Sequence, residues 1–194
     1  MFNSMDINEV VGVLKAGGVI VHATETCYGF ACDAFNEDAL EKLYKLKQMD
    51  FDKPVSLLVA SLKDAKKLGL FNKRAEELAK KYWPGPLTII VRRKKALPKF
   101  LNPKAKTVGI RVPGHKLSLE LAKKFGSPLT TTSANISGQP SPYSVSAIKK
   151  QFKGAKLKPD LILDSGRIPT NPPSTIIDCS GKVLKVIRQG SIRI

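Results

Sequence analysis

Apolar residues recur at helical spacing in four stretches of the chain, and residues that start or stop helices bound them. Gly17 and Gly18 follow the first stretch, and Asn36, a frequent N-cap residue type, precedes the second. Ser61 and Asp64 have the spacing of a capping box, which predicts that a further helix begins there. The periodicity itself predicts helices over residues 6–16, 37–48, 73–82 and 116–125.

Short apolar runs lie between these helices, as expected for strands that are buried in a sheet. They predict strands over residues 19–21, 55–60, 87–93, 108–112, 129–132, 160–164, 174–179 and 183–188. Because strands and helices alternate, the sequence predicts an α/β fold with a mixed sheet. No repeat or linker divides the chain, so we expect residues 1–194 to form a single domain.

The chain has 194 residues, of which 42% are hydrophobic. This composition fits a globular protein that folds without disulfide or metal cross-links. No apolar run approaches the ~20 residues of a membrane span, and the N-terminal residues lack a signal-peptide pattern. We therefore expect a cytoplasmic protein with no membrane partner. Cys27, Cys32, Cys179, His22 and His115 match no zinc-binding spacing, so reduced thiols are expected and no metal ligand is assigned.

The charge changes this picture, because it is large and unevenly distributed. The net charge is +17, yet residues 1–60 carry five Lys and Arg against nine Asp and Glu. The remaining residues carry 28 basic against seven acidic side chains. This asymmetry favours a polyanionic partner, with RNA the first candidate and a nucleoside triphosphate the second. A lysine-rich surface that only serves solubility is the alternative.

A hydroxyl-rich stretch, residues 130–141, reads TTTSANISGQPS and carries six hydroxyl side chains. Hydroxyl and amide donors beside a glycine suit an oxyanion or a nucleotide, which backbone can then approach closely. A loop that only makes local side-chain turns is equally consistent with the composition. The standard phosphate-binding patterns GxxxxGK[ST] and GxGxxG are absent, and so is the GxSxG nucleophile motif.

Four other segments could contribute to such a site. Residues 23–29 are polar and directly follow a predicted strand, where open α/β sheets bind ligands. Residues 45–54 form a basic helix end, and residues 107–113 carry a single arginine on a strand. The fourth segment joins Ser174-Thr175 to residues 186–190. Each signal alone is weak, since a lone strand arginine often forms a structural ion pair.

Taken together in this order, these motifs form a pattern that is typical of one protein family. The chain resembles the YrdC/TsaC family of threonylcarbamoyl-AMP synthases from about residue 17 to residue 190. The resemblance implies a YrdC-like twisted mixed β-sheet flanked by helices, with a basic concave face, in a short form without an additional C-terminal domain. It rests on TETCYG, a KxxxxxKP element, WPGPLT, VGIRVP, TTSANISGQPSP, PSTIID and VIRQG.

The resemblance also implies an activity. Family members are nucleotidyltransferases that form threonylcarbamoyl-AMP and pyrophosphate from L-threonine, bicarbonate and ATP. The product serves threonylcarbamoyladenosine modification of tRNA. Mg²⁺ is expected with ATP, and the expected partners are tRNA or double-stranded RNA and a downstream threonylcarbamoyl transferase machinery.

Residue roles follow from the same resemblance. Lys47, Ser133 and Asn135 would be catalytic, and Tyr28 would form a pocket wall. The threonine contacts would be Thr26, Arg111, Thr131 and Ser174. The ATP contacts would be Lys47, Lys53, Thr107, Ser133, Asn135, Ser141 and Arg188.

Two departures from the family pattern concern function. Met49 stands where an arginine is usual, and Leu58 stands where a histidine is common near threonine. Lys45 or Lys53 could supply the missing charge. The alternative function is an RNA- and nucleotide-binding protein, as in the YciO-like branch, with weak or no synthase activity. A carbamoyl-adenylate enzyme that acts on another acceptor is a third hypothesis.

Overall fold

The computed structural model describes residues 6–194. Its helices are α1 (Ile7–Lys15), α2 (Glu37–Lys47), α3 (Leu62–Leu68), α4 (Lys73–Tyr82), α5 (Lys116–Phe125) and α6 (Val145–Gln151). Its strands are β1 (Ile20–Ala23), β2 (Tyr28–Ala31), β3 (Ser56–Leu58), β4 (Gly69–Leu70), β5 (Leu87–Arg93), β6 (Thr107–Arg111), β7 (Leu129–Ser133), β8 (Leu161–Ile162), β9 (Thr175–Asp178) and β10 (Lys185–Arg188).

Local hydrogen bonds fix the helix ends that the sequence predicts. The Asn36 side chain accepts from the Ala39 amide at 2.9 Å and begins α2. The Ser61 hydroxyl accepts from the Asp64 amide at 3.1 Å and donates to the Asp64 carboxylate at 2.6 Å, which begins α3. Gly17 ends α1 with a φ of 80°, a left-handed conformation that glycine adopts without strain. These predicted boundaries are confirmed.

The strands form one mixed sheet in the order β10-β9-β5-β6-β3-β7-β2-β1-β8, and β4 adds to β5. The pairs β1–β8, β3–β6 and β5–β9 are parallel, whereas the other pairs are antiparallel. The prediction of an α/β fold with a mixed sheet is confirmed. The sequence does not predict β2, β4 or α6.

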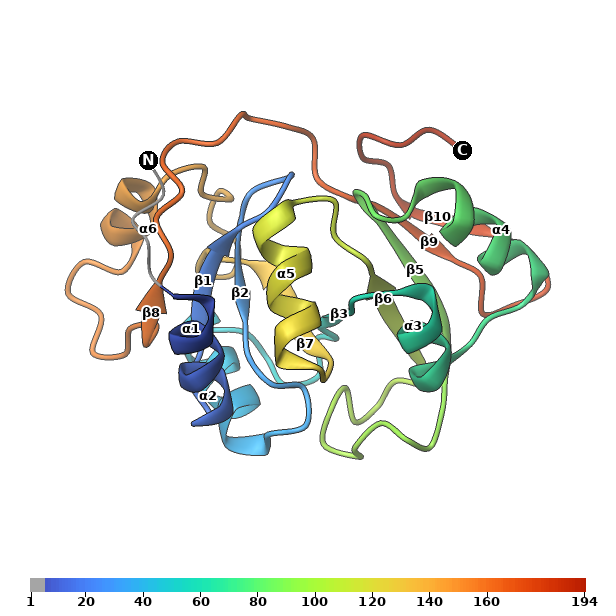
Figure 1. The fold of residues 1–194 in the computed structure, drawn as a ribbon, viewed down its shortest axis with the longest axis horizontal. Helices are drawn as coiled ribbons and strands as arrows, with labels where there is room; N and C mark the ends of the chain where they lie inside the picture. The colour runs from blue at the N-terminus through green and yellow to red at the C-terminus, as the bar shows by residue number, and fades with distance from the viewer. Residues whose placement is uncertain (1–5) are drawn as a thin grey trace.

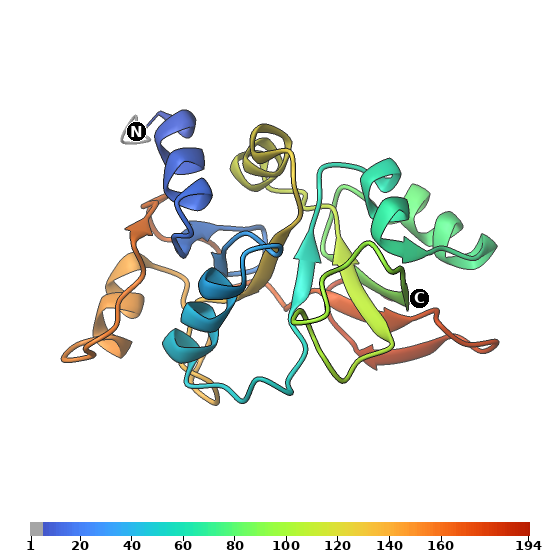
Figure 2. The same cartoon turned by 90° about the horizontal axis from the view of Figure 1, so that it is seen from below.

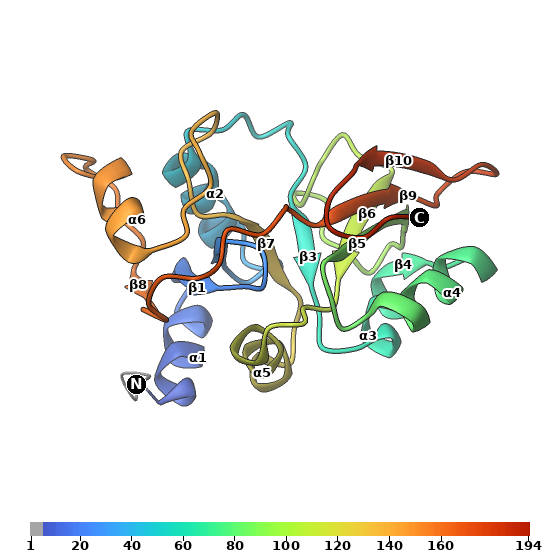
Figure 3. The same cartoon turned by 90° about the horizontal axis from the view of Figure 1, so that it is seen from above.

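The hydrophobic core has two parts. The larger part packs α2, α3, α4 and α6 against the strands, and the smaller part lies under α1 and α5. Figure 1 shows α5 in front of the centre of the sheet. Figures 2 and 3 show that α1 and α5 lie on the opposite side of β1, β2 and β7 from α2 and α6. The part of the sheet that contains β1, β2 and β7 is therefore covered on both faces, as its apolar strands require.

An extended segment links the two ends of the sheet. Residues 163–174, here called the strap, run from β8 at one end to β9 near the other (Figure 1). The Tyr28 hydroxyl donates to the Gly166 carbonyl at 2.7 Å and accepts from the Ser165 amide at 2.9 Å. The Asn171 side chain donates to the Glu25 carbonyl at 2.9 Å. Within residues 6–194, no helix has the length and apolar character needed to cross a bilayer.

Candidate functional site

A cavity of about 230 Å³ opens along the middle of the sheet. Its wall takes residues from seven neighbouring strands, from β10 to β2, and from the turns beside them. Seven of the predicted site residues line it: Thr26, Arg111, Thr131, Ser133, Ser141, Ser174 and Arg188. The structure thus brings together segments that are up to 162 positions apart in the sequence.

Strand alternation decides which side chains reach the cavity. On β2, Gly29 lines the cavity, whereas Tyr28 and its neighbour Phe30 point into the larger core. The prediction that Tyr28 forms a pocket wall is therefore wrong, because its ring lies on the opposite face and its hydroxyl holds the strap. On β6, a Cβ added to Gly109 would lie 2.8 Å from the Ser56 hydroxyl, so glycine keeps this wall open.

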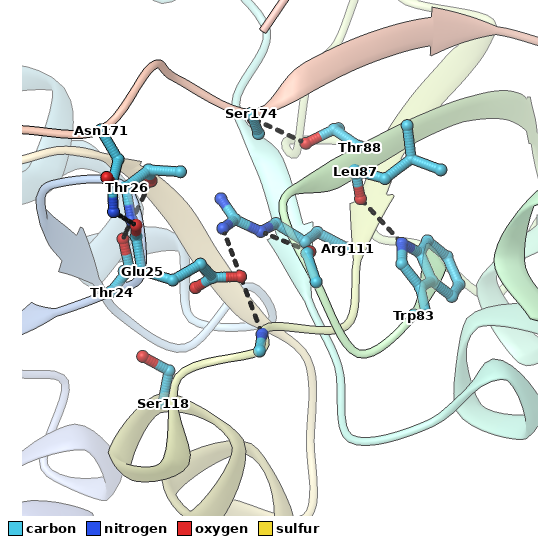
Figure 4. A network of polar contacts seen from close by, with 12 residues as sticks. Thr24, Glu25, Thr26, Trp83, Leu87, Thr88, Arg111, Ser118, Asn171 and Ser174 are labelled. Atoms are coloured by element: carbon cyan, nitrogen blue, oxygen red, sulfur yellow. Dashed lines mark hydrogen bonds and ion pairs between the residues drawn. The ribbon is translucent and has the colours of Figure 1, made fainter. Parts of the chain in front are cut away.

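Arg111 lines the cavity, and Figure 4 shows it beside Glu25. It is 5% exposed, and its Nη2 lies 2.7 Å from Glu25 Oε1 in an ion pair. Arg111 Nε donates to the Gly85 carbonyl at 3.2 Å, and Glu25 Oε1 accepts from the Gly114 amide at 2.8 Å. Beside it, the hydroxyls of Thr24 and Thr26 are 3.0 Å apart. A fixed guanidinium next to hydroxyl donors suits a carboxylate ligand.

Arg188 contributes a second guanidinium from β10. Its Nε donates to the Ser174 carbonyl at 3.0 Å, and its Nη2 donates to the Ser174 hydroxyl at 2.9 Å. Ser174 Oγ also lies 3.3 Å from the Thr88 hydroxyl on β5. Partial burial and the like charge of Arg111 lower the pKa of Arg188 from its ordinary value. Both arginines therefore line the same cavity.

The hydroxyl-rich loop after β7 is held in place by the end of α2. Lys47 Nζ donates to the carbonyls of Ser133 at 2.6 Å and Asn135 at 3.0 Å, and the Lys47 carbonyl accepts from the Ser137 amide at 2.8 Å. The Asn135 side chain donates to the Ile136 and Gln139 carbonyls at 2.8 and 2.6 Å. Lys47 and Asn135 thus shape the loop, while Ser133 and Ser141 present their side chains to the cavity.

Four of the predicted ATP-contacting residues do not line the cavity. Lys47 is 3% exposed, and burial lowers its pKa to about 8. Asn135 is also buried. Lys53 is exposed and lies 3.6 Å from the Asp50 carboxylate, and Thr107 lies further along β6 on the same face as Gly109. Their contacts with a nucleotide stay predictions.

The two residues that depart from the family pattern both pack against apolar side chains. Met49 is partly buried against the larger core, beyond the left-handed C-cap Gln48. Leu58 is 1% exposed and belongs to the smaller core under α5, where it faces Leu129 across the β3–β7 ladder. Neither residue lines the cavity. Lys45 pairs with Glu41 at 3.0 Å.

Metal ligands are scarce around the cavity. Among residues 6–194, no group of three His, Cys, Asp or Glu side chains is placed to bind a metal, and no carboxylate lines the cavity. Burial lowers the pKa of His22 to about 4, so its ring is neutral at physiological pH. The lining residues therefore do not fit a protein-bound Mg²⁺ site with carboxylate ligands.

The resemblance assigns no individual role to ten further residues of the cavity. Most of them belong to the motifs that carry the resemblance or to the KP element, and this membership is the signal that points to them. They are Thr24, Cys27, Gly29, Pro54, Val55, Ser56, Thr88, Thr132, Pro173 and Ile176.

Comparison with known protein families shows to which family the chain belongs. The family described as "Telomere recombination" (Sua5, YciO and YrdC) matches residues 12–190. The chain belongs to this family. The matched range includes every cavity residue, from Thr24 to Arg188, so the Sua5/YciO/YrdC assignment covers the whole site.

Relatives in the Sua5/YciO/YrdC family resemble the chain over most of its length. A Methanocaldococcus jannaschii protein, provisionally named threonylcarbamoyl-AMP synthase, is 38% identical over 92% of the chain and 82% of that protein. The Pyrococcus abyssi Sua5 structure complexed with L-threonine is 32% identical, with a TM-score of 0.88 over 95% of the chain. The chain covers only 54% of that protein. E. coli YciO is 29% identical with a TM-score of 0.85, over 95% of the chain and 89% of YciO.

Proposed function

We propose that the protein is an L-threonylcarbamoyladenylate synthase, a nucleotidyltransferase that forms threonylcarbamoyl-AMP and pyrophosphate from L-threonine, bicarbonate and ATP. One observation carries the proposal: Arg111 and Arg188 line a single cavity together with the hydroxyls of Thr131, Ser133 and Ser174. One guanidinium suits the carboxylate of an amino acid and the other suits phosphate. The names of the relatives support this substrate pair.

The proposed chemistry needs charge neutralisation rather than a covalent nucleophile. Substitution at the α-phosphate concentrates negative charge on phosphate oxygens, which oriented donors and cations stabilise. Arg188, Ser133 and Ser141 are proposed to bind the phosphates, with Lys47 and Asn135 as residues that shape the loop. Arg111 is proposed to bind the threonine carboxylate, with Thr26, Thr131 and Ser174 near it. Mg²⁺ is proposed to arrive with ATP, bound to its phosphates.

The cellular context is part of the proposal. The product is proposed to pass to a threonylcarbamoyl transferase machinery that modifies tRNA, and the high positive charge supports direct contact with RNA. The free thiols of Cys27, Cys32 and Cys179 support a cytoplasmic location.

The test is a pyrophosphate-release assay on the full chain with ATP, Mg²⁺ and bicarbonate, with and without L-threonine. We expect release that depends on threonine, and L-valine as a control substrate should support much less. Arg111→Lys keeps the charge but loses the planar fork, and it should raise the KM for threonine about tenfold or more. Binding of ATP without any threonine-dependent release would instead identify a nucleotide-binding protein.

A further inference from the structure

The two arginines of the cavity have different partners: Arg111 pairs with the Glu25 carboxylate, whereas Arg188 is bonded to neutral groups of Ser174. This difference affects which substrate each arginine binds. We propose that Glu25 is a specificity-determining residue: it neutralises Arg111, so that this part of the cavity accepts a zwitterionic amino acid and rejects phosphate, which goes to Arg188. The inference rests on the proposed function, since it assigns the two substrates to the two arginines of one site.

Glu25 is held against Arg111 from two sides. Its Oε1 lies 2.7 Å from Arg111 Nη2 and accepts from the Gly114 amide at 2.8 Å (Figure 4). The side chains are 6% exposed for Arg111 and 21% for Glu25, so water screens the pair weakly. The Gly85 carbonyl fixes Arg111 Nε at 3.2 Å. The carboxylate is therefore held firmly against the guanidinium that lines the cavity.

Glu25 is ionised in this position. Burial acts to raise its pKa, but the Arg111 guanidinium and the Gly114 amide outweigh that effect and hold the pKa of Glu25 below its ordinary value. The Arg111–Glu25 pair consequently has no net charge at neutral pH.

Arg188 has no such counter-charge. Its hydrogen bonds go to the neutral carbonyl and hydroxyl of Ser174. No carboxylate lines the cavity in the part of the chain that the structure describes. A polyphosphate is therefore attracted to Arg188 more strongly than to Arg111, whose charge Glu25 offsets.

The decisive experiment compares the wild-type chain with Glu25→Gln, which keeps the shape of the side chain and removes its charge. Calorimetric titration with pyrophosphate should show roughly tenfold tighter binding in Glu25→Gln, because one repulsive charge close to the anion is removed. The KM for threonine should rise about tenfold, while the KM for ATP changes little. A merely structural defect would not tighten pyrophosphate binding.

The control is Asp160→Asn, which removes a carboxylate paired with Lys42 at 2.5 Å outside the cavity and should leave pyrophosphate affinity unchanged. Unchanged or weaker pyrophosphate binding in Glu25→Gln would overturn the inference. The wild-type chain gives a second test: pyrophosphate should not compete with threonine, and competition would also overturn it. Tighter pyrophosphate binding in Glu25→Gln, without threonine-dependent catalysis by the wild type, would support the charge role of Glu25 and reject the synthase function.

Discussion

Lys47 shows how one buried cation can organise a binding loop without entering the cavity. Its ammonium donates to two carbonyls of the hydroxyl-rich loop, and it is 3% exposed. Burial without a carboxylate partner disfavours its charged form and lowers its pKa from 10.5 to about 8. The loop geometry and the protonation of Lys47 are therefore coupled.

This coupling predicts a pH dependence of stability. Between pH 8 and 10.5 the unfolded chain holds a proton on Lys47 that the folded chain has lost, so the free energy of unfolding rises with pH in this window. The wild type should gain about 3 kcal/mol relative to Lys47→Met between pH 7 and 10.5, measured by urea unfolding. Lys45→Met, at a more exposed position on the same helix, is the control and should follow the wild type. Parallel curves for the wild type and Lys47→Met would contradict the prediction.

Met49 stands where the family pattern has an arginine, so substituting it tests what that charge contributes to activity. Restoring a cation with Met49→Arg should raise threonine-dependent turnover about tenfold or more, since one additional cation can stabilise the transferring phosphoryl group. It should also cost about 1–2 kcal/mol of stability, because Met49 packs against the larger core. Met49→Leu is the packing control. An equal or lower rate in Met49→Arg would show that the local geometry has no use for an arginine.

Among the secondary-structure elements, local signals were sufficient to predict α1 to α5, but not α6 or the site. Asn36 and Ser61 fix helix starts through bonds to residues three positions away, so sequence spacing shows them. The β1–β2 hairpin places Tyr28 in the core and Gly29 at the cavity, and the missing prediction of β2 explains the wrong assignment of Tyr28. The Arg111–Glu25 pair spans 86 positions, so no local pattern could reveal it.

The β9–β10 hairpin positions Arg188, and Gly190 lies just beyond the end of β10. A Cβ at Gly190 would overlap the Pro173 carbonyl oxygen and lie 2.6 Å from the Ser174 backbone, beside the cavity. Gly190→Ala should therefore displace β10, lower stability by about 1–3 kcal/mol and weaken ATP binding. Gly181→Ala, in the same hairpin, is the control, because its nearest neighbour atom would be 3.9 Å away. Thermal unfolding and ATP titration measure both effects, and equal behaviour of the two variants would refute this role of Gly190.

For the whole molecule, the net charge of +17 sets the conditions under which RNA binds. If the chain contacts six or more phosphates, its affinity for tRNA should fall about a thousandfold between 50 and 200 mM KCl. Threonine has no net charge, so its affinity in the same salt series should change little and serves as the control. Fluorescence anisotropy with labelled tRNA measures the slope. Negligible binding at low salt would show that the basic residues serve solubility alone.

The strap has a consequence for how the protein could be divided. A protease recognition site inserted between Arg167 and Ile168, in the strap, would split the chain into a large piece that keeps Arg111 and a short piece that keeps Arg188. The parallel ladder from Leu87–Thr175 to Ile90–Asp178 would hold the short piece in place. The cut protein should elute as one particle in gel filtration and as two pieces under denaturing conditions. The substrate site would then be a non-covalent complex of two peptides, open to fragment complementation with synthetic versions of the shorter one.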